Sequence, residues 1–285
     1  MEMIEKTVLE QLHEKELEIV KEIASACKKM NINYYISFGT LLGAVRHQGF
    51  IPWDDDVDIW MKRDDYEIFL REGKKYLPDH LFIQHYSTER YADHMYIKVR
   101  DTNTLFLEKV NENLNINHGI FVDIFPLERI NPSGAKWEYF KRCKFNLING
   151  CYDLGYIDRM TNPVKKFIGK IIHNSITKLY DRNKYIKHED ERRKKKHRLG
   201  GSVFLVGFFT YCGTAEYSIL DSIESYKFED TFLDGAADGR KLLEQIYGNY
   251  MELPPVEERG AHNPVKIVFD LRKKVSEEKT DRGAR

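Results

Sequence analysis

Four carboxylates within five positions, Asp54, Asp55, Asp56 and Asp58, are the residues whose types and spacing most directly suggest chemistry. They run straight into an apolar segment, and the side chains of Asp56 and Asp58 would share one face of a strand. Two like charges held that close repel unless a cation neutralises them, and oxygen-only ligands suit Mg²⁺ or Mn²⁺. We therefore predict that Asp56 and Asp58 bind a divalent metal, with Asp54 and Asp55 behind them or in solvent. A solvated acidic turn is the alternative.

Two further segments would complete a metal-dependent site. The turn Ser37–Thr40 ends a strand candidate and opens a helix, so its backbone N–H groups could bind a phosphate; an ordinary strand-to-helix turn is the alternative. Asp123 is a lone acid in an apolar segment, and a buried carboxylate needs a partner. That partner is either the metal or a basic residue, Lys98 or Arg100. A glycine turn upstream of strand-borne acids is the arrangement of nucleotidyltransferase-fold enzymes.

Hydrophobic spacing and turn residues delimit the elements that must position these side chains. Asp64 is the predicted N-cap of the second helix below, and Pro126 is predicted to close the last strand. The helix candidates are 3–30, 65–76, 133–152, 162–182 and 238–248, and the strand candidates are 34–38, 57–61, 81–86, 95–100, 105–110 and 119–125.

The pattern predicts an α+β fold with a nucleotidyltransferase-like mixed β-sheet core flanked by helices and a mostly helical C-terminal half. We divide the chain into a catalytic core at 1–132 and a helical, basic region at 133–215, which would face the second substrate of the reaction, its acceptor, or a membrane. Residues 216–275 would complete the site, and 276–285 would form a flexible tail.

Composition excludes several classes of protein. The 285 residues carry 45 basic and 45 acidic side chains, and this balance argues against a nucleic-acid-binding protein. No apolar run is long enough to span a membrane, and the N-terminus does not read as a secretory signal. The four cysteines form no CxxC pair, as expected of reduced thiols. We therefore expect a cytoplasmic protein, which could lie peripherally on the inner face of the membrane.

The segment Gly-Thr-Leu-Leu-Gly-Ala-Val-Arg-His-Gln-Gly-Phe-Ile-Pro-Trp-Asp-Asp-Asp-Val-Asp-Ile, from Gly39 to Ile59, resembles the signature of the LicD family. Three later segments are similar to that family's pattern as well: Lys98–Thr104, Val122–Leu127 and Tyr247–Arg259. The resemblance spans about residues 20–262, and its first motif is long and highly specific.

This resemblance implies transfer of a phospho-alcohol, typically phosphocholine, from a CDP-activated donor to a hydroxyl of a cell-surface glycan, with release of CMP. The glycan would be a teichoic acid, capsule or lipopolysaccharide, either free or carried on a lipid, and the donor would be CDP-choline, CDP-ribitol or another CDP-alcohol. The family's metal-binding acids match Asp56, Asp58 and Asp123, and Asp123 would complete the metal site or take the hydroxyl proton. Fukutin-type glycan phosphotransferases share the acidic element.

Basic and aromatic residues near these motifs are the candidates for substrate contacts. Arg100 is the favoured phosphate ligand, with surface or ion-pair roles as the alternative for each basic residue. Trp53 and Trp60 would form an aromatic cage if the alcohol is choline, and core packing is the alternative. The full set of predicted substrate-binding residues is Gly39, Thr40, Arg46, His47, Trp53, Lys98, Arg100, Arg259 and His262.

Two segments need separate interpretation. The family often carries a proline between a Phe-Glu pair and the Tyr-Gly motif, but Phe228-Glu229 is followed here by Thr231–Ala237, which contains none, so this wall of the site should differ. The segment 164–198 combines an apolar stripe with many lysines and arginines, which is typical of a helix on an anionic membrane surface. A core-facing helix with a solvated basic face is the alternative.

Two other functions use the same residues. A nucleotidyltransferase that activates an alcohol or sugar with CTP would release pyrophosphate instead of CMP. A glycan- or membrane-binding protein without activity is the second alternative, and the intact acids argue against it.

Overall fold

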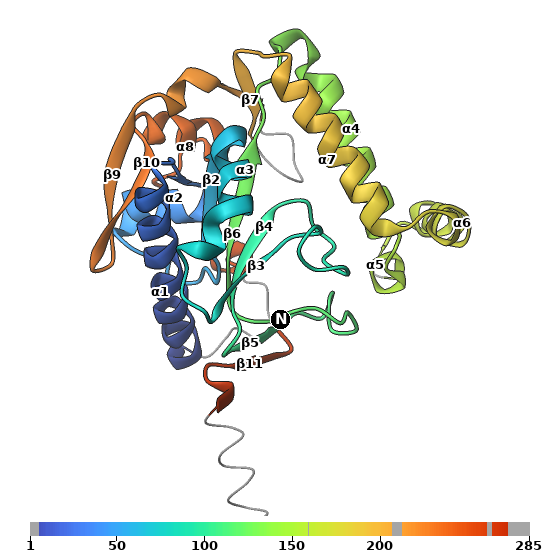
Figure 1. Cartoon of the computed structure of the whole chain (residues 1–285), viewed down its shortest axis with the longest axis horizontal. Coiled ribbons are helices and arrows are strands. Elements are labelled where there is room, and N and C mark those ends of the chain that lie inside the picture. The colour runs from blue at the N-terminus through green and yellow to red at the C-terminus, as the bar shows by residue number, and fades with distance from the viewer. Residues whose placement is uncertain (1–5, 159, 207–212, 261–263, 273–285) are drawn as a thin grey trace, which may run out of the picture.

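The computed structural model describes residues 6–158, 160–206, 213–260 and 264–272. At its centre is a five-stranded sheet of order β1-β2-β6-β4-β3, in which β2 and β6 are parallel and the other pairs antiparallel (Figure 1). The strands are β1 (Tyr35–Ile36), β2 (Asp58–Lys62), β3 (Leu81–Gln84), β4 (Ile97–Asp101) and β6 (Phe121–Leu127). This mixed sheet with its surrounding helices confirms the predicted α+β class.

One face of the sheet is covered by α1 (Lys6–Met30) and α3 (Arg63–Glu72). Strand side chains alternate between faces, and the apolar set, which includes Ile59 and Ile124, packs against apolar residues of both helices. The helix predicted at 3–30 is confirmed as α1. The second helix begins at Arg63, with Lys62 rather than Asp64 as its N-cap.

The opposite face is only partly covered. Tyr35, Trp60 and Leu127 pack there against a second core cluster contributed by β7 (Val203–Leu205), β8 (Thr214–Glu216) and α8 (Gly239–Tyr247). Further along the same face the row changes to Asp58, Asp123 and Lys98. The sheet therefore presents its polar row where the apolar cover ends.

The strand β6 continues through Pro126, which was predicted to close it. Pro126 lies opposite Met61 of β2, beyond Ile124, the last β6 residue paired with β4. A proline cannot donate to a ladder but is tolerated where one side of the strand has no neighbour. The missing N–H therefore does not interrupt the pairing with β2.

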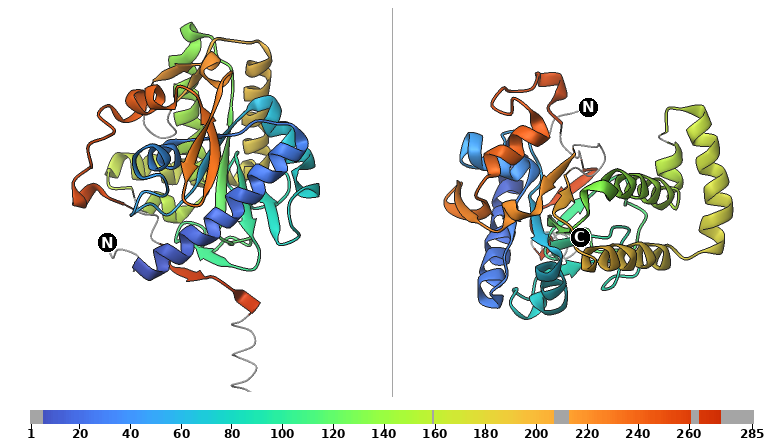
Figure 2. Two further views of the ribbon diagram at one scale, coloured as in Figure 1. Left: turned by 90° about the vertical axis from the view of Figure 1, so that its left-hand side faces the viewer. Right: turned by 90° about the horizontal axis from the view of Figure 1, so that it is seen from above.

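The helices of the second half are concentrated at 135–198, and strands follow them. The helices are α4 (Ala135–Gly150), α5 (Leu154–Asp158), α6 (Pro163–Leu179) and α7 (Arg182–Arg198), and they form an arm beside the sheet with α6 at its outer end (Figures 1 and 2). The remaining elements are α2 (Phe38–His47), the pair β5 (Leu105–Leu107) and β11 (Lys266–Val268), and the hairpin β9 (Ile223–Phe228) and β10 (Thr231–Ala236).

A buried ion-pair network joins this arm to the sheet. Arg63 of α3 donates to Glu128, directly after β6, at 2.6 Å and to Asp190 of α7 at 2.9 Å. Arg142 of α4 donates to the second oxygen of Glu128 at 2.8 Å. Because Arg63, Glu128 and Asp190 are all nearly inaccessible to solvent, each charge depends on the others for neutralisation.

The basic run from Arg192 to Arg198 lies on α7, and part of it is turned inward. Arg192, Arg193 and Lys194 form salt bridges with carboxylates of α3, α4 and α7. These three charges are therefore paired within the protein, whereas Lys195 and Arg198 of the same run are exposed, so membrane contact through the run stays a prediction.

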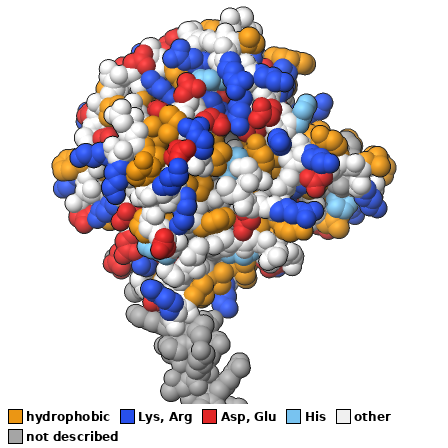
Figure 3. Space-filling model, in the orientation of Figure 1, with side chains coloured by type: hydrophobic (Ala, Val, Ile, Leu, Met, Phe, Trp, Pro, Cys, Tyr) orange, Lys and Arg blue, Asp and Glu red, His pale blue; other side chains and the backbone are white. Residues whose placement is uncertain are grey.

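The helix α6 differs, since it exposes Val164, Phe167, Ile168 and Ile171. Hydrophobic side chains are interspersed with basic ones at that end of the molecule (Figure 3). Membrane contact through α6 stays a prediction. Among the described residues, no helix combines the length and apolarity needed to cross a bilayer.

We predict that Arg63→Met destabilises the protein by about 3–5 kcal/mol, because it leaves Glu128 and Asp190 buried with less compensating charge. Urea unfolding followed by circular dichroism measures the loss. Arg71→Met, on the exposed side of the same helix, is the control and should change stability by less than about 0.5 kcal/mol. Equal effects of the two variants would contradict a structural role for the network.

Candidate active site

The register of the central strands brings three charged side chains into one row. Asp58 of β2 lies opposite Asp123 of β6, and Asp123 lies opposite Lys98 of β4. Lys98 Nζ donates to Asp123 Oδ2 at 2.9 Å and lies 2.8 Å from Oδ1. The predicted convergence of Asp58 and Asp123 is therefore present, and so is the alternative in which Asp123 pairs with Lys98.

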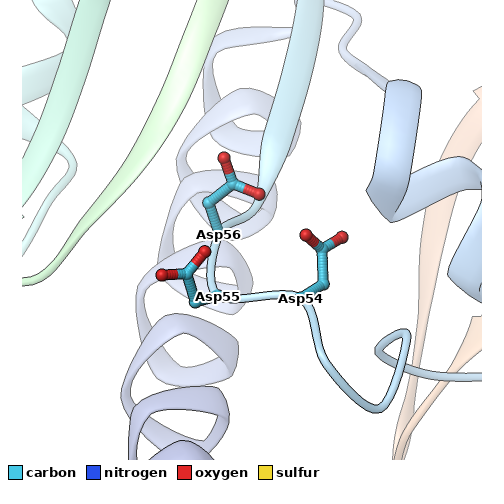
Figure 4. Close-up of side chains that lie close together, drawn as sticks. All are labelled: Asp54, Asp55 and Asp56. Atoms are coloured by element: carbon cyan, nitrogen blue, oxygen red, sulfur yellow. The ribbon is translucent and has the colours of Figure 1, made fainter. Parts of the chain in front are cut away.

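Asp54, Asp55 and Asp56 form a compact acidic group in the loop that enters β2 (Figure 4). Each contributes a carboxylate oxygen, and these oxygens all lie within 4.8 Å of one another. Asp55 is only 1% exposed, which corrects the expectation that it could be solvated. Gly39 lies against this group, and a Cβ there would collide with the Asp54 carboxylate.

A sixth acid, Glu16 of α1, lies close to this group and was missed by the sequence analysis. Glu16 is 2% exposed, and its Oε2 has no hydrogen-bond partner among the described residues. Burial and the charges of Asp56, Asp55 and Asp54 raise its pKa well above the ordinary range. The sequence does contain a signal for the burial of Glu16: it lies on the apolar stripe of α1, four residues after Leu12 and three before Ile19.

The same effects act on the aspartates of the strands. Burial, followed by repulsion from Asp56 and Asp123, raises the pKa of Asp58 well above its usual range. Burial also raises the pKa of Asp123, although Lys98 opposes the shift. Carboxylates crowded in this way favour either protons or a bound cation. The oxygen-only donor set fits Mg²⁺ or Mn²⁺, with Asp54, Asp55 and Asp56 as the residues whose oxygens lie close enough to hold one ion and Asp58 lining the same cavity.

A cavity of about 770 Å³ opens on the Asp58 side of the row. The acids and the start of α2, at Phe38 and Gly39, line it on one side. The opposite wall is formed by residues between Tyr247 and Gly260, including Tyr250 and Pro254. Backbone N–H groups of the first turn of a helix have no intrahelical partner, so the start of α2 can donate hydrogen bonds to an anion here.

Two arginines meet at Trp53 on the rim of this cavity. The Arg259 guanidinium lies 4.3 Å from the centre of the Trp53 ring, and that of Arg46 lies 5.9 Å from it. Burial and the charge of Arg259 lower the pKa of Arg46. Arg46 donates to the Tyr250 carbonyl at 2.9 Å and Arg259 to the Pro254 carbonyl at 3.1 Å, so the remaining N–H groups of this pair are the ones that could bind an anion such as a phosphate.

Three predicted contacts have other roles here. The Thr40 hydroxyl accepts from Asp58 N at 2.8 Å, so Thr40 holds the catalytic strand rather than lining the cavity. His47 Nε2 accepts from Arg46 Nε at 3.0 Å and supports that arginine. Trp60 is 2% exposed within the second core cluster, so it packs in the core, as the alternative to an aromatic cage with Trp53 predicted.

A second cavity of about 380 Å³ opens on the Asp123 side of the row. Asp123 and Lys98 form its floor, and α4, α5 and the residues around Asn111 form its walls. Arg100 does not line either cavity: it is 1% exposed and donates to Gln84 Oε1 and to the Gly119 carbonyl. This placement corrects the prediction that Arg100 is the favoured phosphate ligand. His262 lies outside the described residues.

The segment that departs from the family pattern forms the hairpin β9–β10. Glu229, at its tip, accepts from Phe50 N at 3.0 Å and donates its own N–H to the Gln48 carbonyl at 2.8 Å. The pair Phe228-Glu229 therefore anchors the loop that leads into the acids, while residues 247–260 supply the wall of the first cavity.

A mixed sheet whose parallel pair carries neighbouring aspartates, beside a glycine at the start of a helix, defines a nucleotidyltransferase-type domain. Residues 31–146 match the family described as LicD/FKTN/FKRP, nucleotidyltransferase domain. The lipopolysaccharide cholinephosphotransferase LicD of Haemophilus influenzae is 28% identical over 267 residues, which cover 87% of this chain and 92% of the relative. The chain is therefore similar to LicD-family proteins, through the matched domain at residues 31–146 and through the alignment with this relative over most of its length.

Shorter similarities connect the chain to two uncharacterized rickettsial proteins. One, from Rickettsia prowazekii, is 51% identical over 55 residues, 19% of this chain and 20% of the relative. The other, from Rickettsia typhi, is 52% identical over 48 residues, 17% of this chain and 16% of the relative.

We predict that Glu16→Gln stabilises the protein without divalent metal, raising Tm by about 3 °C at pH 7. A raised pKa means that the folded state resists ionising Glu16, so wild-type stability falls as pH rises from about 4.3 through the raised pKa. The gain should therefore be small near pH 4 and larger at pH 7. Thermal unfolding in EDTA measures it, with Glu14→Gln, exposed on the same helix, as the control. A gain independent of pH would contradict this explanation.

Proposed function

We propose that this protein transfers phosphocholine, or a closely related phospho-alcohol, from a CDP-activated donor to a hydroxyl of a cell-surface glycan such as lipopolysaccharide. The observation that carries the proposal is the meeting of two cavities at the Asp58–Asp123 pair. The activity named for the Haemophilus influenzae relative, which aligns over most of both chains, supports the choice of alcohol and acceptor.

The first cavity is proposed to hold the CDP portion of the donor. The start of α2 and the two arginines at Trp53 would contact the diphosphate. The larger volume of this cavity suits a nucleotide. Its tyrosines and prolines offer apolar surface to the base and ribose.

A divalent cation is proposed at the acids that border this cavity, Asp54, Asp55, Asp56 and Asp58. When bound, it would neutralise charge on the diphosphate and on the leaving CMP. Thr40 and Gly39 act indirectly: Thr40 fixes the backbone of Asp58, and Gly39 leaves room for the Asp54 carboxylate.

The proposed reaction is a single displacement at the phosphorus that bears the alcohol. The hydroxyl oxygen of the glycan forms a bond to this phosphorus, and the bond to the oxygen bridging to CMP breaks. CMP leaves with that electron pair, and the hydroxyl proton passes to the carboxylate of Asp123. Lys98 holds Asp123 in place through the hydrogen bond to Oδ2.

We predict that Asp58→Asn lowers transfer more than about a hundredfold, because it removes a charged ligand from the acids that line the first cavity. Purified protein is incubated with Mg²⁺ or Mn²⁺, CDP-choline and lipopolysaccharide, and phosphorus NMR follows the release of CMP and the new phosphodiester. Asp79→Asn, an exposed aspartate away from both cavities, is the control. Near-normal turnover by Asp58→Asn would refute the assignment of the site.

The same experiment separates the alternatives when CDP-ribitol, CDP-glycerol and CTP replace CDP-choline. CMP from a different CDP-alcohol would keep the reaction class and change the alcohol. Pyrophosphate from CTP would instead establish a nucleotidyltransferase. Release of neither product from any donor would contradict the proposed transfer.

We predict that Arg46→Met raises KM for the CDP-alcohol about tenfold or more, because a charge-assisted hydrogen bond contributes about 1.5–3 kcal/mol. The measurement is initial rates of CMP release against donor concentration, with Arg71→Met as the control. The slope of log KM against log salt should also fall in Arg46→Met, since one cation has been removed from the anion site. An unchanged KM would exclude Arg46 from donor binding.

A further inference from the structure

The second cavity contains two buried oxygen atoms that accept no hydrogen bond from the described residues. They are Asp123 Oδ1 and Asn111 Oδ1, on side chains that are 6% and 7% exposed. Lys98 Nζ lies 2.8 Å from Asp123 Oδ1 but donates its hydrogen bond to Oδ2. A buried acceptor without a donor is costly, so Asn111 Oδ1 calls for a ligand that carries O–H groups, and Asp123 Oδ1, which already faces the Lys98 ammonium, can accept a further hydrogen bond from the same ligand.

The charged residues that line the second cavity narrow the class of ligand further. Four carboxylates line the cavity, Asp93, Glu108, Asp123 and Asp153, against two cations, Lys98 and Arg182. Both cations are already engaged: Lys98 pairs with Asp123, and Arg182 lies 3.4 Å from Asp93 and donates to Asn149. The two extra carboxylates would repel an acceptor bearing a phosphate or carboxylate.

The walls add aromatic surface and a polar amide. Tyr96, Phe145 and Tyr156 line the cavity. The Tyr156 ring packs so closely on Gly150 that a Cβ there would collide with it. Asn146, one residue after Phe145, also lines the cavity. Aromatic rings together with amides and carboxylates suit the apolar face and the hydroxyls of a sugar.

The position of the second cavity relative to the first indicates which substrate it binds. In phosphoryl transfer the attacking and leaving oxygens lie roughly in line on opposite sides of phosphorus. If CMP leaves from the Asp58 side, the nucleophile must approach from the Asp123 side. We propose that the second cavity binds the accepting sugar and that this unit is neutral and rich in hydroxyls. A quaternary ammonium group has no O–H or N–H to donate, so choline would not satisfy the two oxygens.

This inference rests on the proposed function, and its test separates the two. We predict that Asn111→Leu lowers the ratio of transfer to donor hydrolysis about tenfold, the size expected from losing one hydrogen bond in a buried site. Phosphorus NMR measures both reactions with CDP-choline, Mg²⁺ and a methyl hexoside as the acceptor. Asn146→Ala should lower the same ratio and serves as a second, partly exposed variant if Asn111→Leu does not fold. Asn33→Leu, exposed and outside the cavity, is the control.

Saturation-transfer NMR of the methyl hexoside, without donor, provides a readout independent of activity. Signals that weaken in Asn111→Leu but not in Asn33→Leu would support the sugar pocket even if no CDP-alcohol reacts. A methyl glucuronide that binds and accepts as well as the neutral hexoside would overturn the assignment. So would an Asn111→Leu variant that changes the preference between CDP-choline and CDP-glycerol while leaving the transfer ratio intact, because the cavity would then hold the alcohol.

Discussion

The site depends on the parallel register between β2 and β6. This pairing sets Asp58 beside Asp123, and the antiparallel pairing of β4 then places Lys98 on the far side of Asp123. A shift of either strand by one residue would turn its aspartate to the apolar face against α1. Because Ile59 and Ile124 are buried against the helices on the other face, the hydrophobic core itself prevents that shift.

The core that fixes the register also concentrates negative charge. Glu16 and Asp58 are buried close to the acidic loop, and burial together with the neighbouring carboxylates raises the pKa of both, so their simultaneous ionisation is unfavourable. Buried carboxylates whose ionisation is unfavourable are typical of functional sites, where a bound cation or substrate compensates their charge. The buried network of Arg63, Glu128 and Asp190 is different, because there both carboxylates are paired with a cation.

Local patterns in the sequence predict the helices, the strands and the central acids. They do not predict the role of a side chain whose hydrogen-bond or ion-pair partner is distant in the sequence. Asp58 and Asp123 stand out because each interrupts an apolar strand. The guanidinium of Arg100 reads as a phosphate contact, yet it donates to Gln84, and the hydrogen bond from Asp58 N to the Thr40 hydroxyl was not predicted at all. The run after Arg192 reads as solvated because its partners, Glu67 and Glu138, lie on other helices more than 50 residues away.

The floor and the wall of the second cavity come from different segments of the chain. The segment that matches the family domain, residues 31–146, ends inside α4. The floor of the second cavity, Asp123 and Lys98, lies within that segment, but Asp153, Tyr156 and Arg182 of its wall lie beyond it. The catalytic row and the wall opposite it are therefore built from different parts of the chain. Changes in α5 or at the start of α7 can reshape the second cavity without moving the acids, because the sheet fixes the acids independently of the arm.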